Sequence, residues 1–334
     1  MHENRRRASR VTLRRFSVCA GVPLMALSLA ASGKRVQFHP QFVPGSTLRY
    51  SIESRTTTNG TTTTPVLNPE GGTRSTLTIH LLVRLDVLSA PSGPGPGAAR
   101  LRATCEKSSA ESESDAFDPA QPSVSDQYSR LQGKSLEFTM APDGQIVDLA
   151  GANDLRSDAT IAQSAVSWLA GLSAAGGFPT GGVEIGQKWK SERPVEGAPL
   201  RGLAWHVEST YLRDEPCNPP AALSGSRRGP AVGPESCAVI LSRFEISRGG
   251  SRGGETTPED YLRNGLRVSG SWTGSGESLN YVSLATSLLV RSTETSDQQM
   301  DYKITSAATG SNIERKAQVH SQSEITLVRA SPSP

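Results

Sequence analysis

The chain has 334 residues, with 35 lysines and arginines against 32 aspartates and glutamates, a formal net charge of +3. Residues 1–31 hold six arginines and one glutamate, so the remainder carries 29 basic and 31 acidic side chains, and electrostatics give no case for binding nucleic acid or an anionic membrane. Apolar residues make up 35% and aromatic residues 5%, which favours a β-rich protein with long loops over a helical bundle.

The amino terminus has the pattern of an export signal. Arginines crowd residues 5–15, an uncharged apolar run follows from Phe16 to about Ala31, and small residues such as Ala30 and Ser32 close it. This order predicts a cleaved secretory signal peptide at residues 1–31 and a periplasmic or secreted protein. An uncleaved membrane anchor is the alternative, but the apolar run is shorter than the roughly 20 residues that span a bilayer.

A long strand is predicted at residues 77–87, where apolar and mostly polar side chains alternate. Successive side chains of a strand point to opposite faces, so this segment has one apolar face and one wetter face. The apolar set comprises Leu77, Ile79, Leu81, Val83, Leu85 and Val87.

Shorter alternating segments flank this strand, at residues 48–53, 101–106, 136–140 and 146–149. Pro142, Asp143 and Gly144 separate the last two and are typical of a hairpin turn. Two polar stretches, residues 56–72 with a turn at Asn59-Gly60 and residues 108–129, are predicted to be exposed loops.

A helix is predicted at residues 161–175. Ile161, Ala165, Trp168 and Leu172 fall at helical spacing, and no charged residue occurs between Ile161 and Ala175. A helix that faces solvent normally carries charges, so this one is expected to pack on the concave face of a sheet.

Strand patterns resume after the helix, at residues 183–190, 203–210, 237–246, 266–272, 288–295, 300–304 and 317–327. Together they predict a mainly β fold of about ten to twelve antiparallel strands with one apolar helix on the concave face. Residues 32–330 would form a single β-rich domain, or two halves at 36–150 and 183–330 joined by the helix at 160–175.

The cysteines fit an oxidising compartment. Cys217 and Cys237 flank a segment rich in proline, glycine and serine, and a disulfide between them would close the base of a long hairpin. Cys105 shares its parity with Leu101 and Ala103, which predicts a buried thiol.

Three short segments resemble a known type of protein: FVPGSTLRY at residues 42–50, VEIGQKW at 183–189 and GSWTGSG at 270–276. They resemble uncharacterised exported proteins of acidobacterial type that are β-rich. The architecture which that resemblance implies is similar to the half-barrel of lipoprotein carriers, a curved antiparallel sheet around an apolar cavity. It implies no catalytic residue.

The sequence motifs do not assemble a catalytic or metal site. Residues 249–253 match G-x-S-x-G, but no helix pattern follows Ser251 and His320 is the one later histidine. The histidines are scattered, and an acidic run lacks the register of a calcium loop, so each is interpreted as solvated surface. These residues are His39, His80, His206, His320, Glu111, Glu113, Asp115 and Asp118. We expect no enzyme activity, no cofactor and no metal.

The pattern favours an exported protein that binds a lipid-like or other apolar small molecule in a β-sheet cavity. The alternative is a structural or interaction module of the bacterial envelope that meets a partner protein through its surface loops. Membrane contact would be peripheral or absent. The residues predicted to line the cavity are Leu81, Val83, Phe138, Met140, Trp168, Leu172 and Trp205.

Overall fold

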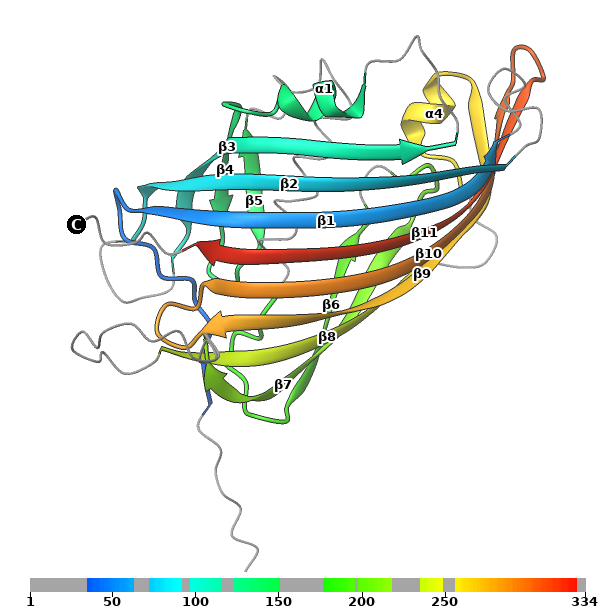
Figure 1. Ribbon diagram of the computed structural model, residues 1–334. Coiled ribbons are helices and arrows are strands. Elements are labelled where there is room, and N and C mark those ends of the chain that lie inside the picture. The colour runs from blue at the N-terminus through cyan, green and yellow to red at the C-terminus, as the bar shows by residue number, and fades with distance from the viewer. Residues whose placement is uncertain are drawn as a thin grey trace, which may run out of the picture. The chain divides into compact units, whose positions relative to one another are not determined.

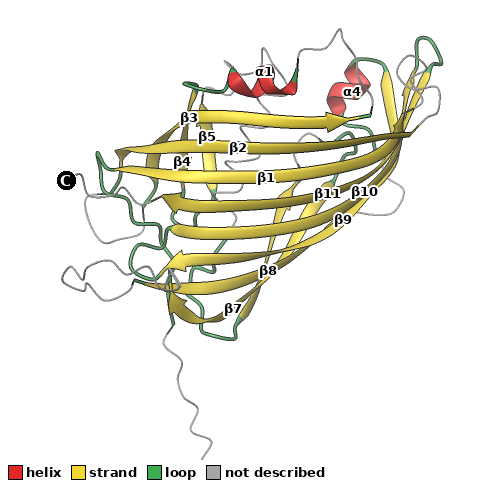
Figure 2. Cartoon of the chain, in the orientation of Figure 1, coloured by secondary structure: helices red, strands yellow, loops and turns green. Residues whose placement is uncertain are grey.

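A computed structural model describes residues 35–62, 72–91, 97–115, 123–150, 177–195, 198–217, 235–248 and 256–328. One sheet contains all eleven strands of these ranges, in the order β5-β4-β3-β2-β1-β11-β10-β9-β8-β7-β6. Every neighbouring pair is antiparallel (Figures 1 and 2), which confirms the mainly β, antiparallel prediction.

The strands are long, and four of them have 17 or 18 residues. Their bounds are β1 Thr47–Thr62, β2 Gly72–Ser89, β3 Ala99–Ser114, β4 Ser135–Met140, β5 Ile146–Ala150, β6 Lys188–Pro194, β7 Leu203–Pro216, β8 Ser236–Arg248, β9 Leu266–Ser283, β10 Leu289–Ser306 and β11 Asn312–Val328.

The first and last strands join the two ends of the chain into one sheet. β1 pairs with β11 from Arg49 opposite Val328 to Thr62 opposite Arg315. Strands β2 to β5 continue outward beyond β1, and β10 to β6 continue outward beyond β11. The stretches 36–150 and 183–330 therefore contribute to the same sheet.

The predicted loop at residues 56–72 is wrong in its first half. β1 extends to Thr62 because its run of β-branched threonines suits an extended strand and pairs with β2 on one side and β11 on the other. Asn59-Gly60 is not a turn. Gly60 lies opposite Ala317, and a Cβ atom there would stand 2.7 Å from the Lys316 carbonyl oxygen, so glycine permits the close approach of the two backbones.

The predicted loop at residues 108–129 is also wrong in large part. β3 continues to Ser114 against β2, and residues Val124–Ser129 form the short helix α1, which begins after the cap Ser123. The segments predicted separately at 288–295 and 300–304 belong to one strand, β10, because its polar middle still pairs with β9 and β11.

The sheet is strongly curved. Neighbouring strands lie about 4.8 Å apart, so a flat sheet would hold β4 and β7 roughly 40 Å from each other. Yet Phe138 of β4 and Tyr211 of β7 belong to one hydrophobic cluster. Figure 1 shows both ends of the sheet curling to the same side. The face on that side, which carries Tyr50, Ile52 and Val83, is called the inner face here.

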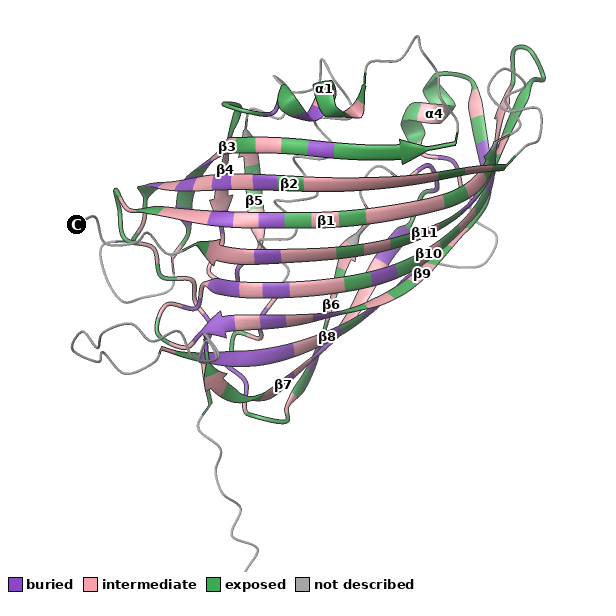
Figure 3. Cartoon of the chain, viewed as in Figure 1, coloured by how far each residue is buried: buried purple, intermediate pink, exposed green. Residues whose placement is uncertain are grey.

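The outer face is lined by charged pairs between neighbouring strands. Arg102 binds Glu137 at 2.6 Å and Lys188 binds Glu208 at 2.9 Å. Arg49 of β1 also reaches across β2 to Glu106 of β3, with Nε 2.9 Å from Oε2. The alternation therefore separates a wet outer face from an inner face with a core, and Figure 3 shows the buried positions of β1 and β2 gathered toward one end of the strands.

The described helices are short. α1 has six residues and α4, Glu259–Arg263, has five, and both carry acidic side chains in the first turn. The neutral helix predicted at residues 161–175 lies outside the described residues, so an apolar helix on the concave face is not confirmed. None of the helices that the structure describes is long and apolar enough to cross a membrane.

The predicted disulfide between Cys217 and Cys237 is confirmed. It links residues 20 positions apart, where β7 ends and β8 begins, beside the hydrogen bond that the Cys217 nitrogen donates to the Glu235 oxygen. A disulfide indicates a non-reducing environment. Cys105 is free and buried, as predicted, and burial raises the pKa of its thiol to about 11.

Candidate functional site

The inner face is closed at one end by the segment that precedes β1. Val36 pairs with Val183, and the Gln41 nitrogen donates to the Thr286 oxygen at 2.8 Å. Phe38 stacks on Phe178 with ring centroids 4.5 Å apart. These contacts connect the β6 end of the sheet to the turn between β9 and β10, so this end of the curved sheet is filled by side chains.

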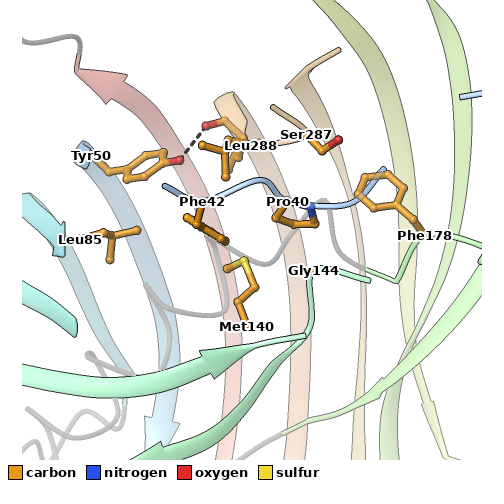
Figure 4. A pocket seen from close by; sticks show the side chains of 10 residues that line it. Pro40, Phe42, Tyr50, Leu85, Met140, Gly144, Phe178, Ser287 and Leu288 are labelled. Atoms are coloured by element: carbon orange, nitrogen blue, oxygen red, sulfur yellow. Dashed lines mark hydrogen bonds between the residues drawn. The ribbon is translucent and has the colours of Figure 1, made fainter. Parts of the chain in front are cut away.

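A small cavity lies beside these aromatic side chains (Figure 4). Its volume is about 30 Å³, and its lining comes from the segment before β1, from β1, β2 and β4, and from the turn before β10. A space of this size holds about one or two water molecules and no lipid. The Tyr50 hydroxyl donates to the Leu289 oxygen at 2.9 Å at its edge.

A row of polar side chains, five serines and one glutamate, crosses the inner face beyond the closed end. Strand register places them side by side on six consecutive strands, from β7 to β1. We call them the serine row: Ser209, Ser242, Ser278, Glu294, Ser323 and Ser54. Ser209, Ser242 and Ser278 are buried. Ser209 and Ser242 share a hydrogen bond of 2.8 Å.

Further polar groups border the serine row. Asn280 is fully buried, donates to the Ser278 hydroxyl at 3.1 Å and accepts from the Ser292 hydroxyl at 2.7 Å. Thr56 and Ser321 share a hydrogen bond of 3.2 Å. A continuous apolar core would have large apolar side chains at these positions, so the serine row and its polar neighbours interrupt the core.

Glu294 is the charged member of the serine row. Among the carboxylates of β8 to β11, it is the one at an inward position; the others lie on the outer face. Protein surrounds the side chain on most sides, although it keeps some exposure. Desolvation by burial raises its pKa, and the charge of Arg193 on β6 opposes that shift in part.

Apolar side chains return on the far side of the serine row and form a second cluster. Its buried members are Leu200, Leu203, Ile246, Val268 and Tyr302. Trp205, Trp272, Met300 and Ile304 pack against them and are only partly buried. Trp205 meets Phe244 edge to face, with ring centroids 5.1 Å apart. This part of the inner face is apolar and incompletely covered.

Of the seven residues predicted to line a cavity, the five that the structure describes lie in two different clusters. Leu81, Val83, Phe138 and Met140 lie in the main core, and none is more than 7% exposed. Met140 alone of these lines the small cavity. Trp205 lies in the second cluster, and the remaining two residues, Trp168 and Leu172, lie outside the described residues. Their part in binding stays a prediction.

The remaining sequence candidates lie apart. His80, His206 and His320 each pair with a carboxylate of a neighbouring strand, with His320 Nδ1 2.8 Å from Asp297 Oδ1. No group of three or more metal-ligating side chains occurs in the part of the chain that the structure describes. Ser251 lies outside that part.

The pH dependence of stability tests the environment of Glu294. The folded-state pKa lies above the unfolded one, so the folded protein binds more protons between the two values, and the free energy of unfolding should fall as pH rises through the folded pKa. Glu294→Gln should remove this fall and raise the free energy of unfolding at pH 7 by about 1–3 kcal/mol.

Urea unfolding from pH 4.5 upward measures this effect. Glu277→Gln, at an outer-face position of β9, is the matched control and should change stability by less than about 0.5 kcal/mol. A Glu294→Gln protein that is less stable than the unsubstituted one at pH 7 would show that the carboxylate is well solvated.

No family model and no curated protein matches the chain. Among solved structures, the chain is similar to one that describes lipid–protein interactions in lipovitellin, with 11% identity and a TM-score of 0.45. The similarity covers 88% of this chain and 26% of that one, so the chain spans about a quarter of that protein's length. The expected resemblance to acidobacterial exported proteins stays a prediction.

Proposed function

We propose that the protein is an exported, non-enzymatic binding protein that holds an amphipathic, lipid-like molecule on the inner face of its curved sheet. The ligand would lie beyond the closed end, with its apolar part on the second cluster and its polar part at the serine row. Export by a signal at residues 1–31 is part of the proposal, and the Cys217–Cys237 disulfide is in keeping with it.

This proposal is supported by the order in which packed, polar and apolar surfaces follow one another along the inner face. A packed core ends at a row of small polar side chains, and the apolar side chains beyond that row remain partly buried. Trp205, Trp272 and Met300 are each partly exposed on the inner face, opposite the face that carries the ion pairs. A ligand with one apolar and one polar part matches both surfaces.

Titration of the delipidated protein with a fluorescent fatty acid tests the proposal. We expect saturable uptake at one molecule per chain. Trp272→Ala should weaken that uptake because it removes apolar contact from the inner face. Thr273→Ala changes the next residue, which is exposed on the outer face, and should bind as the unsubstituted protein does.

Circular dichroism would confirm that both variants are folded at the temperature of the titration. Absence of stoichiometric uptake by the folded, delipidated protein would overturn the proposal. Equal loss in both variants would place the contact away from the inner face.

A further inference from the structure

Arg193 holds an unusual position for an arginine. It lies on β6 directly opposite Trp205 of β7, and its register places it on the inner face with Trp205 and Ile246. Its Nε atom is buried and has no hydrogen-bond acceptor. Buried donors in folded proteins nearly always have a partner, so an unpaired guanidinium nitrogen calls for an acceptor supplied from outside the chain.

The charged side chains near Arg193 indicate which kind of acceptor would bind there. At inward positions of β8 to β11 the cations are Arg248 and Arg315, both exposed, and the carboxylate is Glu294. No ion pair joins Arg193 to Glu294 within 4.0 Å; the two interact only through their charges. The inner face thus keeps a cation and a carboxyl group that do not neutralise each other by contact.

The shape of the guanidinium favours a carboxylate. Its planar fork of N–H donors matches the two oxygens of a carboxylate, and such charge-assisted pairs are stronger than neutral hydrogen bonds. Burial raises the pKa of Glu294, which lowers the repulsion that this carboxyl group would exert on a bound carboxylate. Beside Arg193, Trp205 and the second cluster offer apolar contact to an attached chain.

We propose that Arg193 binds the carboxylate of an amphipathic acid, of the long-chain fatty acid class, whose hydrocarbon chain lies along the second cluster. This inference rests on the proposed function. It adds the chemical class of the ligand and names Arg193, whose charge acts on Glu294 of the serine row, as the residue that anchors the polar part.

Parallel titrations of the full-length protein with a fluorescent fatty acid and with its methyl ester test the inference. The two probes share the chain and differ only in the charge of the head group. The unsubstituted protein should bind the acid at least about tenfold more tightly than the ester. Arg193→Gln should weaken binding of the acid by about tenfold and leave binding of the ester unchanged.

Arg243→Gln is the matched control, because Arg243 lies on the outer face of β8 and is 71% exposed. It should keep the full preference for the acid. Equal affinity for acid and ester in the unsubstituted protein would overturn the inference and leave the proposed function standing. Binding of neither probe would overturn the proposed function itself, and an unchanged preference in Arg193→Gln would assign the carboxylate to another residue.

Discussion

Replacing Phe138 by alanine is expected to lower the free energy of unfolding by about 3–5 kcal/mol. The ring is 1% exposed, it lies on β4 opposite Leu101 of β3, and it belongs to the cluster that joins the two ends of the curved sheet. Truncation would leave a cavity that the long neighbouring strands cannot close. Urea unfolding at pH 7 measures the loss.

Val147→Ala provides the control. Val147 lies on the adjacent strand β5, opposite Thr139, and is 43% exposed, so its truncation should change stability by less than about 0.5 kcal/mol. If Phe138 instead lined an open cavity, Phe138→Ala would lose little stability and would bind the fluorescent fatty acid much more weakly.

Removing the disulfide is expected to cost about 3 kcal/mol. The bond joins residues 20 positions apart, and cross-linking a loop of that length reduces the entropy of the unfolded chain by this amount in the chain-entropy account. Cys217→Ser combined with Cys237→Ser should therefore unfold at a lower urea concentration with a similar dependence on urea.

A reducing agent should reproduce the effect in the unsubstituted protein and have no further effect on the double variant. Cys105→Ala is the control, since its thiol is free and the response to reduction should persist in it. If reduction leaves the unfolding midpoint unchanged, the cross-link is not what limits the stability of this region.

The strands were predictable where their side chains alternate between apolar and polar. Residues 77–87 alternate except at Leu82, and Leu81, Val83, Leu85 and Val87 of β2 are all buried. The hairpin between β4 and β5 was predictable for a local reason. Gly144 has a φ of +82° there, a conformation that glycine adopts without strain, and its nitrogen donates to the Ala141 oxygen.

The full length of the strands was not predictable, because their far ends are polar on both faces. Thr56 to Thr62 reads as a loop when taken alone. It is a strand because β2 and β11 satisfy its backbone on both sides. Pairing with strands that are distant in the sequence therefore decides whether such a polar segment forms a strand or a loop, which its local composition does not determine.

The candidate site could not be predicted from the sequence for a related reason. Serines and one glutamate on six separate strands carry no periodic signal, and only the register of the sheet places them in a row. Parity could assign Leu81 and Trp205 to inner positions. It could not show that the first is packed in the core while the second lies in a partly covered cluster.

Photo-crosslinking with a fatty acid that carries a diazirine on its chain tests the central claim most directly. After irradiation of the folded protein and peptide mapping, we expect label on inner-face residues of the second cluster, with Trp205, Trp272 and Met300 as the main sites. Label spread over the outer face, or no label above that of an unrelated protein, would contradict a binding surface on the inner face of this sheet.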